Sequence, residues 1–262
     1  MSEERLDRSA LQRILPPDPT GTDPSVQEVW QRMDTVEEWR DQPVGAWPHE
    51  RALPWGLRFL AEALEHLARH DLARLIHLER VALCRELDDL EALGGALSDL
   101  RRNLERQGRL EEAVLIAHEE REVHLRLVAI DPWSVEVANH ARREITRMLA
   151  ELGRHEDAAE SAASALRELR EQPERSRRPS IAYDLADAQN DLAASLVHLG
   201  RLEEAYEPTA AAVEFWRTHT DEQRPRCIST LNELGRRLVS IGRVEEGNAA
   251  CAEAARISGM RT

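Results

Sequence analysis

The sequence Gly108-Arg109-Leu110-Glu111-Glu112-Ala113 occurs, with small changes, four times along the 262-residue chain. Its counterparts begin at Gly153, Gly200 and Gly242, and a decayed copy begins at Ala68. Successive copies are 40 to 47 residues apart, a period that is typical of stacked helical repeats. We therefore expect an all-α solenoid, a class of protein that binds other molecules far more often than it catalyses reactions.

Each copy reads as a tight turn between two helices. Glycine after the last turn of a helix adopts the left-handed conformation, and acidic residues suit the positive end of the next helix. One boundary has no glycine, and there Asp88 with Glu91 predicts a capping box; a loop is expected from Thr218 to Pro225. The expected first helices of the five pairs are 54–67, 89–107, 134–152, 180–199 and 223–241, and the second helices are 70–86, 110–129, 155–171, 202–218 and 244–258.

The N-terminal segment differs in composition from the repeats. Prolines punctuate residues 1–53, and between them a helix is expected at about 24–41, with Ser25 and Glu28 as its capping box. We interpret 1–53 as an ordered cap over repeats at 54–258, followed by a short tail at 259–262. The alternative is an arm that lies in the protein's own groove. Four tryptophans lie in or just after this segment, and they form either the core of the cap or a recognition pocket: Trp30, Trp39, Trp47 and Trp55.

Composition narrows the classes of function. The chain contains no lysine and carries a formal net charge of −14, which opposes binding to nucleic acid or to an anionic membrane. The absence of lysine also excludes Schiff-base and P-loop chemistry. No apolar run is long enough for a membrane span or a signal peptide, so a cytoplasmic location is expected. The three cysteines, Cys84, Cys227 and Cys251, form no metal-binding or disulfide pattern, and no cofactor is expected.

The small and large residues around each turn resemble those of the tetratricopeptide (TPR) family. The period exceeds the family's usual length, as in the extended repeats of kinesin light chain and of actinobacterial regulatory proteins. The resemblance covers about residues 54–258 and implies a right-handed α-α superhelix that acts as a binding scaffold. The matching positions include Leu97, Leu100, Leu104, Gly108 and Ala113, then Leu192, Leu196, Gly200, Ala205 and Ala212, then Leu231, Leu234, Leu238 and Gly242.

In such arrays the first helix of each pair lines the concave wall, chiefly through the residues ten and six positions before the turn glycine. Applied to this sequence, the register implies an arginine-lined groove in an acidic protein, which suits a carboxylate-bearing protein or peptide. The alternative is that these arginines pair with Glu62, Glu105 or Glu151 on neighbouring turns. The candidate partner-binding residues are Arg58, Arg102, Arg143, Arg147, Asn190, Asn232 and Arg236.

The pair Arg143 and Arg147 resembles the cation pair of the carboxylate clamp in chaperone-adaptor TPRs. The match is partial, because the clamp's asparagines come from earlier repeats whereas Asn190 and Asn232 come later in this chain. The resemblance implies recognition of a carboxylate without specifying a chaperone tail.

Three functions follow from these patterns. The first is a non-enzymatic scaffold that binds an acidic peptide or protein segment, and the second is a ligand- or peptide-responsive regulator that changes its partner. The third, a metal-dependent enzyme centred on His66 and His70, lacks a third ligand in the sequence pattern.

The last repeat has no further capping helix, so its small apolar face is expected either to stay exposed or to form a homodimer contact. That face comprises Ala250, Cys251, Ala254 and Ile257.

Overall fold

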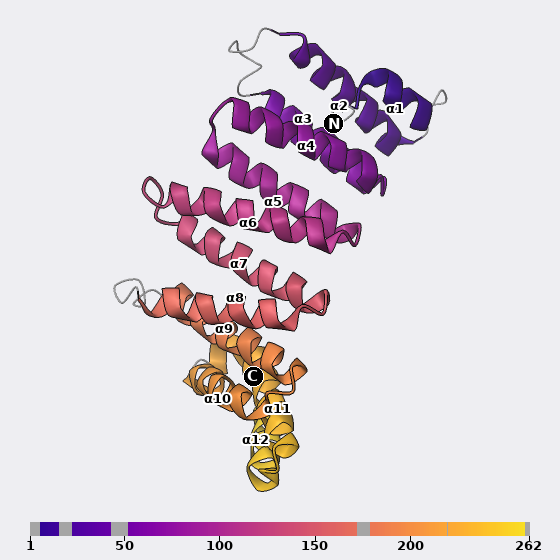
Figure 1. Cartoon of the computed structure of the whole chain (residues 1–262). Helices are drawn as coiled ribbons and strands as arrows, with labels where there is room; N and C mark the ends of the chain where they lie inside the picture. Colours follow the sequence, from indigo (N-terminus) through magenta and orange to yellow (C-terminus); the bar gives the residue numbers. More distant parts are fainter. Residues whose placement is uncertain (1–5, 16–22, 43–51, 172–178, 219, 260–262) are drawn as a thin grey trace. The chain divides into compact units, whose positions relative to one another are not determined.

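The computed structural model of the chain is built from α-helices (Figure 1). It divides into two compact units, residues 1–138 (unit 1) and residues 139–262 (unit 2). None of the described helices is long and apolar enough to cross a bilayer. The structure describes residues 6–15, 23–42, 52–171, 179–218 and 220–259.

The described residues form twelve α-helices and no strand, as the sequence predicts for an all-α repeat protein. Within unit 1, the helices α2 to α6 each pack on the next one along the chain. Helix α7 begins in unit 1 and continues into unit 2. The helices are α1 (Arg8–Ile14), α2 (Pro24–Arg40), α3 (Leu53–His66), α4 (His70–Glu86), α5 (Leu90–Arg106), α6 (Leu110–Leu127), α7 (Ser134–Glu151), α8 (His155–Arg170), α9 (Pro179–His198), α10 (Leu202–Thr218), α11 (Thr220–Ser240) and α12 (Val244–Gly259).

The repeated turn has one geometry throughout the chain. Gly108 has φ +70°, and its N–H donates to the Glu105 carbonyl at 2.9 Å while the Arg109 N–H donates to the Leu104 carbonyl at 3.0 Å. These two bonds satisfy carbonyls that the helix end leaves free. The same pair of bonds forms at Ala68, which has φ +56° without being glycine.

The rest of the repeated phrase starts the next helix. Arg109 donates from Nε to Glu112 at 2.6 Å, three residues on, and Ala113 is fully buried where the two helices cross. A small residue at this crossing lets the helices pack closely. The equivalent ion pairs of the other glycine-containing turns are Arg154–Asp157, Arg201–Glu204 and Arg243–Glu246.

The N-terminal segment shares a core with the first helix pair. Met33 and Val36 of α2 are fully buried in one cluster with Leu57 and Leu60 of α3. The predicted helix at 24–41 is therefore confirmed as α2, whereas the short helix α1 was not expected. The division into a cap, five repeats and a tail remains an interpretation that agrees with these bounds.

Three local predictions are wrong. Helix α2 is capped by Asp23, which accepts from the Ser25 and Val26 N–H groups, so Ser25 is not the cap. Helix α5 is capped by Asp89, because Asp88 takes the left-handed position with φ +51° that closes the preceding helix. The loop expected at 218–225 is helical from Thr220, with Pro225 inside the helix.

Candidate functional site

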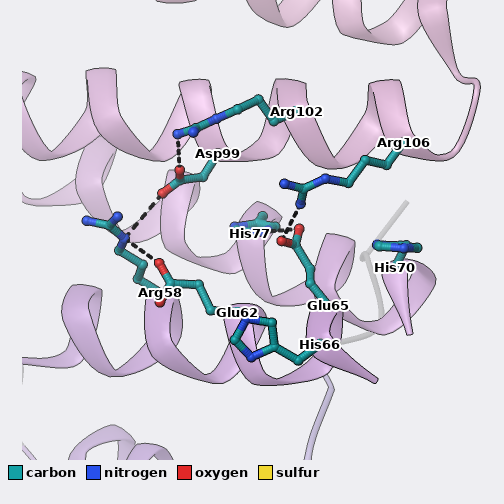
Figure 2. Close-up of a pocket in the computed structure, with 9 residues that line it drawn as sticks. All are labelled: Arg58, Glu62, Glu65, His66, His70, His77, Asp99, Arg102 and Arg106. Carbon is teal, nitrogen blue, oxygen red and sulfur yellow. Dashed lines mark hydrogen bonds and ion pairs between the residues drawn. The ribbon is translucent and has the colours of Figure 1, made fainter. Parts of the chain in front are cut away.

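A pocket of about 330 Å³ lies on unit 1 between the inner sides of α3 and α5 and the first half of α4 (Figure 2). Helix α3 contributes four of its residues, and α5 contributes three from its second half. The sequence placed Arg58 and Arg102 on one wall, and the structure brings both into this pocket. It is lined by Arg58, Glu62, Glu65, His66, His70, His77, Asp99, Arg102 and Arg106.

Asp99 is the centre of the pocket's ion pairs. Its Oδ2 accepts from Arg80 Nη1 at 2.6 Å and lies 3.6 Å from Arg58 Nε, while its Oδ1 accepts from Arg102 Nη2 at 2.6 Å. Figure 2 shows Arg58 and Arg102 reaching Asp99 from two sides. Arg58 also donates to Glu62 at 2.9 Å. Among the described residues of this cluster, three guanidinium groups therefore face two carboxylates, which leaves an excess of positive charge.

Glu65 forms a second centre, beside the first. It accepts from Asn103 Nδ2 at 2.7 Å, lies 3.3 Å from His77 Nε2, and pairs with Arg106. Burial alone would raise the pKa of Glu65, but the hydrogen bonds from His77 and Asn103 and the charge of Arg106 together lower it to about 2. Glu65 is therefore an anion at any neutral pH, and it fixes Arg106 at the edge of the pocket.

His66 and His70, the pair considered as metal ligands, both line this pocket, on either side of the turn at Ala68. A structural zinc site needs three or more protein ligands. Within the described residues, no group of three or more His, Cys, Asp or Glu side chains has an arrangement that would hold a metal ion. The two histidines contribute imidazole donors or acceptors to the pocket's rim.

In unit 2, the two arginines of the clamp-like pair point to different carboxylates. Arg143 on α7 donates to Asp187 on α9 at 2.6 Å and lies 3.6 Å from Asp184. Arg147, one turn along α7, pairs with Glu144 and Glu151, each at 2.6 Å. The alternative was that these arginines pair with glutamates on neighbouring turns of the same helix. The structure shows this pairing for Arg147–Glu151 and, in unit 1, for Arg58–Glu62.

The remaining candidates in unit 2 lie on α9 and α11. Asn190 donates to Thr230 on the next inner helix at 3.4 Å, and Asn232 is half-buried on α11. The Arg236 side chain is 73% exposed and pairs with Glu233 within its own helix. These contacts place the candidates at the predicted register positions but do not gather them into one pocket.

The inner side of α9 carries an unusual carboxyl group. Burial raises the pKa of Asp191 to about 7, the neighbouring Asp187 and Glu144 add to that rise, and Arg143 opposes it. At neutral pH this group is close to half protonated.

Sequence reasoning missed Glu65, His77, Asp99 and Arg106 of the unit 1 pocket, and also Arg80, which pairs with Asp99. Arg80 belongs to α4, the second helix of its pair, and the register predicts only first-helix residues for the wall. Asp99 and Arg106 are on the correct helix, but outside the positions ten and six before the turn glycine. Counting every charged residue on the exposed side of α5 would have found both.

The described tryptophans differ in burial. Trp30 is 8% exposed and Trp39 packs against the same core, as expected for a cap, whereas Trp55 is 54% exposed. Trp47 lies outside the described residues.

The apolar face of the last helix is buried within its own unit. Ala250, Ala254 and Ile257 are each at most 6% exposed and belong to the core shared with α11, while Cys251 is half-buried. Gly235 and Gly247 allow this close packing, since a Cβ at Gly247 would lie 2.7 Å from the Gly235 carbonyl oxygen. The surface on which the predicted homodimer depended is therefore not exposed.

Comparison with solved structures identifies the type of fold. The chain resembles the crystal structure of BtubC (BKLC) from P. vanneervenii with a TM-score of 0.62 at 18% identity, over 92% of this chain and 94% of that one. It also resembles a structure of a Podosopora anserina putative kinesin light chain with nearly identical TPR-like repeats, with a TM-score of 0.58 at 18% identity. That match covers 81% of this chain and 97% of the other. The chain has a TPR-type fold. No protein-family model and no curated protein matches the sequence, so the TPR-type assignment rests on the fold and on the repeated turn.

Proposed function

We propose that this TPR-type protein is a non-enzymatic interaction scaffold that binds an acidic segment of a partner protein on the inner sides of its first helices. The TPR-type fold supports a scaffold role in general. In unit 1 the contacts would be Arg58 and Arg102. In unit 2 the repeat register alone selects Arg143, Arg147, Asn190, Asn232 and Arg236. We expect these residues to add little to binding, because Arg143 and Arg147 already pair with carboxylates of their own unit.

The single observation that supports this proposal is the ion-pair cluster around Asp99. Three arginines share that carboxylate, and Arg102 keeps 54% of its side chain exposed. A guanidinium group has five N–H donors, so an arginine that bonds one carboxylate retains donors for a second. A carboxylate from a partner would balance the excess positive charge of the cluster.

The net charge of −14 does not oppose this contact at short range. At physiological ionic strength, charges more than about 8 Å apart are largely screened, so an acidic segment in the pocket responds mainly to the charges that line it. These are the arginines Arg58, Arg102 and Arg106 and the carboxylates Glu62, Glu65 and Asp99. The pairing that already exists limits the gain, because the partner's carboxylate must compete with Asp99 and Glu62. We therefore expect moderate affinity that weakens as salt is added.

The test is binding of a fluorescent hexaglutamate peptide to the full chain, measured by anisotropy at low and at physiological salt. Replacing Arg58 and Arg102 together by Glu should weaken binding at least tenfold, provided that circular dichroism shows a folded protein. The matched control replaces two exposed arginines outside the pocket, Arg85→Glu and Arg126→Glu, which changes the net charge equally. Equal losses in both variants, or binding that is insensitive to salt, would reject a specific site.

A further inference from the structure

A second pocket, of about 340 Å³, adjoins the first along α3 and also lies within unit 1. The two pockets share Arg58, which lines both. The walls of the second pocket differ in chemistry from those of the first, because they combine an exposed indole, backbone of α5 and a buried arginine. The residues used below are Pro54, Trp55, Arg80, Ala92 and Gly95.

Gly95 leaves space for this pocket but makes helix α5 less stable. It lies inside α5, is exposed, and does not have positive φ. A Cβ built there would meet one described atom, Arg80 Nη2, at 3.6 Å, which is ordinary contact. Neither backbone conformation nor packing thus requires a glycine, although glycine weakens a helix interior relative to alanine. A residue without a side chain is, however, what a site needs where a ligand passes close to the backbone.

Trp55 presents an aromatic wall beside Gly95. Its side chain is 54% exposed, the Arg58 guanidinium lies over its ring at 5.5 Å from the centroid, and the Phe59 ring lies 6.2 Å away. The cation–π contact and the neighbouring ring hold the indole in place. An exposed indole held in this way is typical of binding hot spots.

Arg80 supplies hydrogen-bond donors to the same pocket. The residue is only 6% exposed, its Nη1 donates to Asp99, and its Nε has no hydrogen-bond partner among the described residues. Its Nη2 faces the space above Gly95. The Nε atom is itself enclosed, so Nη2 is the donor that an acceptor in the pocket would meet. Asp89, the nearest capping carboxylate, is already engaged because it accepts from the Ala92 N–H at 2.9 Å.

We infer that this pocket binds a proline-containing extended segment of the partner, with the pyrrolidine ring against Trp55 and a backbone carbonyl accepting from Arg80. Proline fits on two counts. Its ring is a flat apolar group of the kind that aromatic grooves bind in extended proline-rich segments. It also offers a carbonyl to the Arg80 donor and brings no N–H of its own that would need an acceptor.

This inference rests on the proposed function, because it describes a second part of the same partner segment. The acidic residue of that segment would occupy the first pocket and the proline the second, with Arg58 between them. The two parts are nevertheless separable by experiment, since they use different residues and different probes.

The experiment is an NMR titration of the full chain, labelled with ¹⁵N, in which the Trp55 indole signal is identified by its absence in Trp55→Phe. The probes are acetyl-triproline-amide and, as the matched control, acetyl-trialanine-amide. Triproline should shift the Trp55 signal saturably and trialanine should not. In Gly95→Leu, whose side chain fills the pocket, the triproline shift should disappear while hexaglutamate still binds as it does to the wild type.

The outcomes separate the two proposals. Absence of a triproline shift in a protein that binds hexaglutamate would overturn the proline site and leave the acidic site standing. Equal shifts with triproline and trialanine would also overturn it, because the pocket would then not select proline. A triproline shift in a protein that fails to bind hexaglutamate would support the pocket and reject the acidic segment. If neither probe binds, both proposals fail.

Discussion

The inner walls of the two units carry arginines at the same register positions, yet their charges are opposite in balance. In unit 1, Arg58 and Arg102 share one carboxylate, Asp99, with the buried Arg80. In unit 2, Arg143 pairs with Asp187 and lies 3.6 Å from Asp184, and burial together with the neighbouring Asp187 raises the pKa of Asp191. The same register therefore gives, in one unit, a pocket where three arginines share one carboxylate and, in the other, a wall where one arginine lies beside two carboxylates.

This difference shows what decides the charge of a helical repeat's wall. The register determines which positions of each first helix lie on the wall. The carboxylates on the next first helix determine whether an arginine there is already neutralised or can still bind a carboxylate of a partner. Asp99 comes from α5 and Asp187 from α9, and each accepts from an arginine of the preceding pair, Arg80 and Arg143 respectively. We expect removal of these carboxylates to destabilise the two units to different extents.

The largest effect is expected for Asp99→Ala. Removing this carboxylate leaves Arg80, which is 7% exposed at its side chain, without its partner and close to two other cations. Loss of one partner of a buried ion pair should lower the free energy of unfolding by about 3 kcal/mol. The matched change in unit 2, Asp187→Ala, should cost less than about 1 kcal/mol, because Arg143 retains Asp184 and is one-third exposed. Urea denaturation of both variants measures the difference, and equal losses would contradict the comparison.

The next effect concerns the pH dependence of Glu65. Its pKa falls from 4.5 to about 2 on folding, so the stabilisation is complete above about pH 4.5 and is lost as the pH falls towards 2. The shift corresponds to about 3 kcal/mol. In Glu65→Gln the stability of α3 and α5, measured by hydrogen exchange, should lose this part of its acid dependence. An unchanged acid dependence would show that Glu65 is not held as the structure indicates.

Asp191 should give a pH dependence of opposite sign in unit 2. Its pKa rises from 3.8 to about 7 on folding, so between these values the folded chain holds a proton that the unfolded chain has released. Stability should fall as the pH rises through this range. Asp191→Asn should abolish that slope and stabilise α7 and α9 at pH 8, where folding of the wild type buries a charged carboxylate. Destabilisation by Asp191→Asn at pH 8 would contradict the raised pKa of Asp191.

The smallest effect lies in the turn beside the unit 1 pocket. Ala68 has φ +56°, a conformation that costs an alanine about 1 kcal/mol relative to glycine. Ala68→Gly should therefore raise the thermal midpoint slightly, with the increase reduced by the greater freedom of glycine in the unfolded chain. The reverse change in an ordinary turn, Gly108→Ala, should lower it by a similar amount, and scanning calorimetry compares the two.

Most of the fold was predictable because its signals are local. The glycine turns, the arginine–acid pairs after them and the buried alanines recur in sequence, and they fixed all five helix pairs to within a few residues. The cap of α5 was predicted wrongly because Asp88 takes the left-handed conformation that glycine has in the other turns. Asp89, the next residue, is therefore the cap of α5. The start of α11 was missed because a proline inside a helix reads as a break.

The candidate site was only partly predictable, because it depends on contacts between repeats. The register correctly placed Arg58 and Arg102 on one wall, but no local pattern links them to Asp99, 41 and three residues away in sequence. Arg80 comes from a helix that the register assigns to the other side. No sequence pattern singled out Gly95, which the structure places at the second pocket.

The central claim is that the arginine-lined wall of unit 1 carries the recognition of an acidic segment. Calorimetric titration of hexaglutamate into Arg58→Glu/Arg102→Glu and into Arg143→Glu/Arg147→Glu tests it directly, because both pairs lie at equivalent register positions and change the charge equally. We expect binding at least tenfold weaker in the unit 1 variant and a change of less than about twofold in the unit 2 variant. Full binding by the unit 1 variant, with loss in the unit 2 variant, would contradict the account.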